Sequence, residues 1–147
     1  MDSRFDKIFH FLARIGADVG DDEELKLQKS LLVLSTFPFM LAGAGWGILY
    51  LYFGEIRAGL IPLSYSVISL FSVLYFGRNL RFEFFRFSQL LLIMLLPFFL
   101  MLALGGFVKG SAVILWGLIS PLGALLFDTR ERAPRWFMAY LLLVLVS

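Results

Sequence analysis

The chain has 147 residues, of which 60% are hydrophobic and only 16% are charged, and its mean hydropathy is +0.86. A soluble domain of this size could not bury so many apolar side chains, 17 phenylalanines among them, in a single core. The formal net charge of +2 comes from basic residues spread among several segments, which argues against a nucleic-acid-binding surface. The absence of cysteine excludes disulfides and thiolate chemistry. Composition therefore predicts a membrane protein.

The first 29 residues form a charged arm before the first apolar run. Apolar side chains recur in it at helical spacing, at Phe5, Ile8, Phe9, Leu12 and Ile15. This pattern predicts an amphipathic helix that lies on the inner leaflet. After a glycine-containing break, Asp21 or Asp22 is expected to cap a second helix, whose first turn carries Glu23 and Glu24. This second helix is predicted to run directly into the first membrane span.

Four apolar stretches are then long enough to be membrane helices, since a bilayer core of roughly 30 Å needs about 20 residues of helix. They cover residues 31–53, 58–76, 87–104 and 111–127, and none contains Asp, Glu, Lys or Arg. A fifth stretch, residues 136–147, holds about a dozen residues and is too short to cross alone. We therefore expect a fragment that is cut within its fifth helix.

The expected fold is all-α, a polytopic transmembrane helical bundle with four complete spans, a truncated fifth and an N-terminal amphipathic helix. It divides the chain into a cytoplasmic arm with a pre-span helix, residues 1–29, and a bundle, residues 30–147. Lys and Arg alternate between the segments outside the spans as five, one, three, one and three: Arg4, Lys7, Arg14, Lys26 and Lys29; Arg57; Arg78, Arg81 and Arg86; Lys109; Arg130, Arg132 and Arg135. Because basic loops stay in the cytoplasm, this order predicts a cytoplasmic N-terminus.

The spans offer few groups for chemistry. Their lack of charged residues argues against a proton-coupled transporter, a pump, a channel with charged rings or an intramembrane protease. Aromatic and polar side chains that can face the interior define a candidate ligand pocket: Trp46, Tyr50, Tyr65, Ser69, Gln89 and Trp116. A mostly apolar pocket with a few hydrogen-bonding groups is typical of a small-molecule site. The alternative is that the hydroxyl and amide groups only join neighbouring helices by hydrogen bonds.

Small residues and prolines bear on how the helices pack. Gly43 and Gly47 form a GxxxG motif, a candidate helix-packing face that serves either packing within the chain or a dimer contact. One proline lies in or near each complete span, at Pro38, Pro62, Pro97 and Pro121. Each proline removes a backbone hydrogen bond, so it either kinks its helix into a hinge or is simply tolerated there.

Three stretches of the chain resemble a known family. They are GDDEELKLQKSLLVL, WGILYLYFGE and RFSQLLLIMLLPFFLMLALGGFVKGSAVILWGLISPLGALLF. From about Gly20 to its end, the chain resembles the N-terminal membrane region of bacterial adenylate/guanylate cyclase-domain proteins, the class III nucleotidyl cyclases. The resemblance implies six membrane helices in the inner membrane, a cytoplasmic linker helix, and a dimeric cyclase domain that makes cyclic AMP or cyclic GMP with two metal ions.

The predicted function is that of a membrane anchor with sensory and dimerisation roles in a cyclase-type signalling protein. The cyclase domain is absent, so no catalytic, cofactor-binding or metal-binding residue can be assigned here, and divalent metal ions are expected only for the missing domain. Expected partners are membrane lipid, a second copy of the chain and a small apolar or lipid-like ligand, with no nucleic acid. The alternatives are the membrane sensor of a histidine kinase and a small transporter or accessory subunit of a membrane complex.

Overall fold

The computed structural model describes residues 15, 16, 18, 20–110, 112–129 and 131–146. Every regular element in this part of the chain is helical, as the composition predicts. The elements are α2 (Glu23–Tyr52), α3 (Ile56–Asn79), α4 (Phe82–Ala103), the 3-10 helix η1 (Val113–Leu118), α5 (Ile119–Phe127) and α6 (Ala133–Val146). The predicted amphipathic helix of the arm lies outside the described residues, apart from Ile15.

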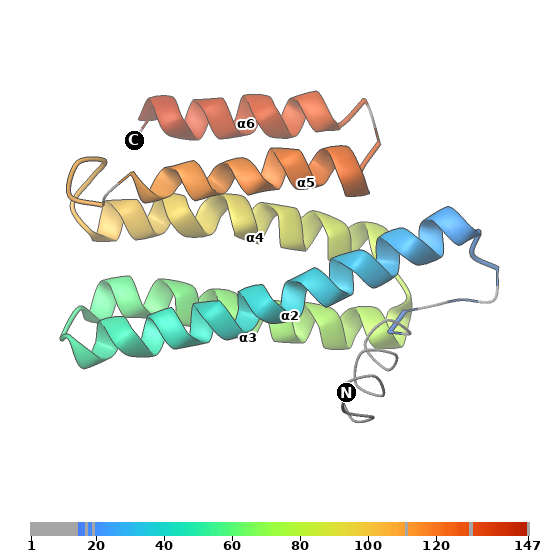
Figure 1. The fold of residues 1–147 in the computed structure, drawn as a ribbon, viewed down its shortest axis with the longest axis horizontal. Helices are drawn as coiled ribbons and strands as arrows, with labels where there is room; N and C mark the ends of the chain where they lie inside the picture. Colours follow the sequence, from blue (N-terminus) through green and yellow to red (C-terminus); the bar gives the residue numbers. More distant parts are fainter. Residues whose placement is uncertain (1–14, 17, 19, 111, 130, 147) are drawn as a thin grey trace, which may run out of the picture.

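The helices run roughly antiparallel, in two groups (Figure 1). One group is the hairpin of α2 and α3, and the other is a row in which α4, α5 and α6 lie in chain order, with α3 packed on α4. The end of the bundle that carries Arg78, Arg81 and Arg132 is called the arginine end below. The opposite end, which carries the turn around Gly54 and the loop with Lys109, is called the Lys109 end.

Three helices, α2, α3 and α4, are long and apolar enough to cross a membrane, which supports a membrane protein. The prediction of four complete spans and a truncated fifth is not confirmed. The fourth stretch folds as a six-residue 3-10 helix followed by the nine-residue α5, and the fifth is the 14-residue α6. Because a 3-10 helix rises about 2 Å per residue, η1 and α5 together extend roughly 25 Å, slightly less than the hydrocarbon core.

The start of α2 agrees with the prediction, whereas the start of α4 differs from it. Helix α2 begins at Glu23 because the Asp22 side chain caps it, accepting a hydrogen bond of 2.8 Å from the Leu25 backbone N–H. From there the helix continues without a break to Tyr52. The capped helix that runs directly into the first span is thus confirmed. Helix α4 begins at Phe82 rather than at residue 87, which brings Arg86 inside the helix.

Glycines set the close approach of α2 and α3. A Cβ built on Gly43 would lie 2.7 Å from the Ser66 hydroxyl, and one on Gly47 would lie 2.9 Å from the Gly59 carbonyl oxygen. Larger side chains would therefore force the two helices apart. The GxxxG motif was predicted to serve either packing within the chain or a dimer contact. In the structure it serves packing within the chain, because α3 covers this face.

An aromatic cluster closes the arginine end. Phe76 of α3 stacks on Phe85 of α4 with ring centroids 4.8 Å apart, and both side chains are fully buried. Ile15 packs against this cluster, and Gly16 lies directly on the Phe76 ring. Ile15 and Gly16 are therefore packed against the helices at this end.

Polar side chains join the helices at several levels. The Ser72 and Ser88 hydroxyls lie 2.6 Å apart between α3 and α4. Ser120 of α5 donates to the Leu90 carbonyl oxygen of α4 over 2.7 Å. In a lipid environment, where water cannot compete, such bonds fix the register of neighbouring helices.

Candidate functional site

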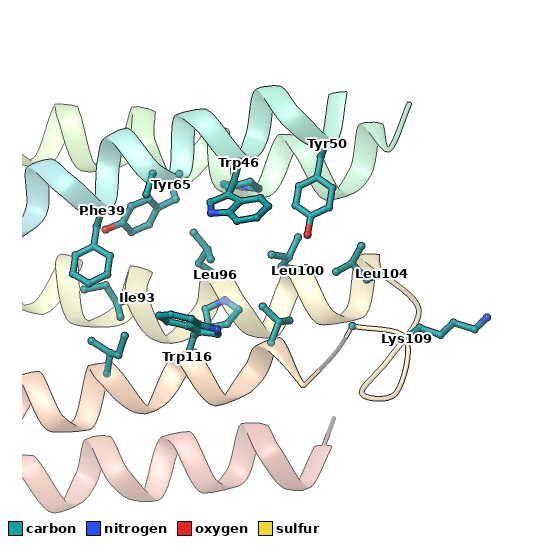
Figure 2. Close-up of a pocket in the computed structure, with 17 residues that line it drawn as sticks. Phe39, Trp46, Tyr50, Tyr65, Ile93, Leu96, Leu100, Leu104, Lys109 and Trp116 are labelled. Carbon is teal, nitrogen blue, oxygen red and sulfur yellow. The ribbon is translucent and has the colours of Figure 1, made fainter. Parts of the chain in front are cut away.

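A cavity of about 650 Å³ lies between the α2–α3 hairpin and the pair formed by α4 and η1, in the half of the bundle near the Lys109 end (Figure 2). Its size is that of a small-molecule site, roughly 300 to 1,000 Å³. Its lining comes from five helices and the loop after α4 and is mostly apolar: Phe39, Ala42, Gly43, Trp46, Tyr50, Pro62, Tyr65, Ile93, Leu96, Pro97, Leu100, Leu104, Lys109, Gly110, Val113, Trp116 and Ile119.

Two tryptophans form opposite walls of the cavity. Trp46 projects from α2 and Trp116 from η1, with Leu96 between them (Figure 2). Tyr50 follows Trp46 one turn later, at a distance of 6.3 Å between the ring centroids. The walls are therefore aromatic, with few polar atoms to fix the orientation of a ligand.

The packing of the glycines explains why space remains here. Gly43 and Gly47 hold α2 tightly against α3, so α2 makes few contacts with α4. On the opposite wall, Gly117 of η1 lies between Pro97 and the Tyr140 ring of α6, so η1 packs closely against α4 and α6. Helix α2 thus packs against α3, and η1 packs against α4 and α6. The space between α2 and η1 is left unfilled.

Tyr65 brings an unsatisfied polar atom to this site. Its side chain is 4% exposed, and its hydroxyl has no hydrogen-bond partner among the described residues. The Ser69 hydroxyl is near it but donates to Gln89 Oε1 over 3.4 Å. A buried hydroxyl without a partner is costly, so a ligand atom that bonded it would bind more tightly.

Lys109 is the charged residue of the lining. It lies at one end of the cavity, and its ammonium extends away from the other lining residues (Figure 2). No carboxylate lies within ion-pair distance of it in the part of the chain that the structure describes. The charge therefore stays near water while the stem covers apolar surface.

The structure brings together four of the six residues named for the candidate pocket: Trp46, Tyr50, Tyr65 and Trp116 all line the cavity. Ser69 and Gln89 do not line it. Both are fully buried between α3 and α4, where they face each other. For these two residues, the structure has the interhelical hydrogen bond that the sequence left as the alternative.

Sequence reasoning missed Lys109 and Pro97 as lining residues. The signal for Lys109 was present, because it is the one basic residue of its short loop, but it was interpreted only as a marker of topology. Its position at a cavity depends on how the loop folds back, with Gly110 packed against Met101 of α4. That contact joins residues whose proximity no local pattern predicts.

No group of three or more His, Cys, Asp or Glu side chains that could hold a metal ion occurs in the described part of the chain. No family model, no curated protein and no solved structure matches the chain.

Proposed function

We propose that the chain is the membrane-embedded sensory region of a signalling protein, and that the cavity between α2 and η1 is its ligand site. The ligand is small and apolar or lipid-like, and the output domain is a class III nucleotidyl cyclase that works as a dimer in the bacterial inner membrane. The cyclase part of the proposal comes from the sequence resemblance. The observation that carries the sensory part is the aromatic cavity itself, since a pure anchor needs no preformed cavity of this size.

The cavity wall is connected to the last helix. Pro97 and Trp116 line the cavity, and Gly117, next to Trp116, packs against Tyr140 of α6. A Cβ built on Gly117 would lie 3.2 Å from the Tyr140 ring and 3.4 Å from Pro97 Cγ. A ligand that moved η1 would therefore press directly on α6.

Signalling then requires two arrangements of η1 and α6 that bind the ligand with different affinities. The Pro97 ring removes one backbone hydrogen bond from α4 at this level, which makes the wall easier to deform. A coupling free energy of about 1 to 3 kcal/mol would change cyclase output roughly 5- to 150-fold.

The proposed dimer does not use the GxxxG face. Gly43 and Gly47 are buried against α3, so a second copy would have to pack on another surface. Helix α6 offers one, because Phe137, Leu142 and Leu145 are exposed along it.

A chimaera tests the function. Residues 1–147, followed by apolar residues that complete the fifth span and by one added apolar helix that returns the chain to the predicted cytoplasmic side, are joined to a class III cyclase catalytic domain. Cyclic nucleotide formation is measured in lipid vesicles with and without a long-chain alcohol or a long-chain carboxylate. We expect at least one probe to change output several-fold.

Two variants serve as a matched pair. Ala42→Phe places a ring in the cavity lining and should abolish the response, whereas Leu41→Phe changes an exposed neighbour outside the lining and should preserve it. Basal activity should remain in both. An output that ignores both probes, or that responds equally when residues 1–147 are replaced by unrelated membrane helices, would reduce this region to an anchor.

A further inference from the structure

The polar groups of the cavity are distributed unevenly along its length. Lys109 and the Tyr50 hydroxyl lie at one end, and the aromatic and aliphatic residues Trp46, Leu96 and Trp116 fill the middle (Figure 2). Among the lining residues, Lys109 alone is charged. The cavity thus has a cationic end and an apolar interior.

Neither polar group at the Lys109 end is satisfied within the described residues. The Lys109 ammonium makes no ion pair there, and the Tyr50 hydroxyl makes no hydrogen bond. The Tyr50 hydroxyl points across the cavity toward α4 (Figure 2). An acidic group at this end would meet a cation and a hydroxyl donor, both of which strengthen binding of an anion.

The apolar part of the cavity is elongated along the helices. Its α2 wall extends from Phe39 to Tyr50, which is roughly 16 Å of helix. Trp46 and Trp116 face each other across it (Figure 2). This shape fits one extended chain lying between two aromatic walls.

Burying a charge in the interior would be costly, but the cationic end avoids that cost. Lys109 is part of the lining, and its ammonium extends away from the other lining residues (Figure 2), at the end of the bundle that is predicted to face the external medium. A ligand with its charge at one end could keep that charge hydrated beside Lys109 while its chain enters the cavity.

We propose that the cavity binds a single-chain anionic amphiphile, of the long-chain carboxylate class, with its head group at Lys109 and its chain between Trp46 and Trp116. This inference rests on the proposed function, because it names the ligand class of the same cavity. Since the loop around Lys109 is predicted to be outside the cell, the ligand enters from the outer leaflet or the external medium.

The test uses the whole chain in phosphatidylcholine nanodiscs and a dibrominated long-chain fatty acid, since bromine quenches tryptophan fluorescence on contact. The chain has three tryptophans, of which Trp46 and Trp116 line the cavity, while Trp136 lies near Asp128 at the other end and reports unspecific quenching. The methyl ester of the same acid is the uncharged control, because it keeps the brominated chain and lacks the carboxylate charge. Brominated phosphatidylcholine represents an ordinary two-chain lipid.

We expect saturable quenching by the acid that is lost when Trp46 and Trp116 are both replaced by phenylalanine. Lys109→Gln should weaken the apparent affinity for the acid roughly fivefold, the size expected for one exposed ion pair, and Lys109→Arg should restore it. The ester should bind more weakly than the acid and should not respond to Lys109→Gln. Lys109 is exposed in a loop, so neither variant threatens folding.

Other outcomes separate this proposal from the proposed function. Equal affinities for acid and ester, or an acid affinity that Lys109→Gln leaves unchanged, would overturn the anionic ligand but leave a cavity for neutral apolar ligands. If brominated phosphatidylcholine quenched saturably and prevented quenching by the acid, the cavity would be a site for bilayer lipid. That result would overturn the proposal. No saturable quenching by any probe would overturn both proposals.

Discussion

Arg86 and Asp128 form a buried ion pair in which Arg86 Nη2 lies 3.0 Å from Asp128 Oδ1 and the side chains are only 10% and 6% exposed. Arg86 also donates from Nη1 to the Phe127 carbonyl oxygen over 2.9 Å, and the Trp136 indole N–H donates to Asp128 Oδ2 over 3.1 Å. The pair thus joins the start of α4, the end of α5 and the start of α6. It fixes the arginine end of the row of helices that forms one cavity wall.

Removing one member of this pair should destabilise the bundle strongly. Arg86→Met leaves the Asp128 carboxylate buried without its cation, a change that costs about 3 to 5 kcal/mol in comparable buried pairs. The unfolding midpoint in detergent micelles should fall accordingly. Arg81→Met, which removes an exposed neighbouring arginine, is the matched control and should change it little.

The double variant Arg86→Met, Asp128→Leu gives a stricter test of the same pair. Because no uncompensated charge remains, its destabilisation should be smaller than the sum of the two single effects. Strictly additive losses would show that the two side chains do not interact energetically.

The glycines of α2 offer a comparison within one helix. A Cβ on Gly47 would lie 2.9 Å from the Gly59 carbonyl oxygen, whereas one on Gly45 meets no atom within 4 Å. Gly47→Ala should therefore destabilise the protein by about 1 to 3 kcal/mol through overpacking against α3. Gly45→Ala should be neutral or stabilise by up to about 1 kcal/mol, since alanine favours helix. Thermal unfolding checks both, and equal effects would contradict the packing described for this face.

Leu80 ends α3 in a strained conformation. Its φ of 55° places it in the left-handed region, and its side chain is 41% exposed. Leu80→Gly should raise stability by about 1 kcal/mol, because glycine adopts this conformation without the clash of a Cβ. Leu80→Ala keeps the Cβ and should bring no such gain. A lower unfolding midpoint for Leu80→Gly would mean that the packing of the leucine outweighs the strain.

Asp21 makes stability depend on pH at the arginine end. The Lys29 ammonium bonds both carboxylate oxygens, at 2.8 and 2.7 Å, and with the Asp18 backbone N–H it lowers the pKa of Asp21 below its ordinary value of 3.8. The unfolded chain therefore binds the proton more readily, so this contribution is complete above about pH 4 and is lost as pH falls through the lowered pKa.

The variant Lys29→Met should reduce this acid sensitivity. Unfolding midpoints measured between about pH 5 and pH 2 should fall less steeply in the variant than in the natural chain. Asp21→Asn removes the titrating group and should give the same reduced slope. Identical slopes in all three proteins would show that the pair contributes nothing to acid unfolding.

Local chemistry in the sequence was sufficient for much of the fold. Apolar runs predict membrane helices because backbone groups in lipid must be paired within the segment, and Asp22 caps α2 by a contact three residues away. Residue type and position within the apolar runs were also enough to predict Trp46, Tyr50, Tyr65 and Trp116 as candidate pocket residues, because this step needs no knowledge of tertiary contacts.

Tertiary structure decided what depends on residues far apart in the chain. Whether a Cβ is tolerated at Gly47 depends on Gly59, and whether Arg86 is a loop charge or a buried partner depends on Asp128. Hydropathy alone marked Arg86 as a cytoplasmic residue and Lys109 as a sign of topology. Only the packing of five helical segments put Lys109 at the opening of a cavity, because a cavity is a property of the space between elements and no single element contains it.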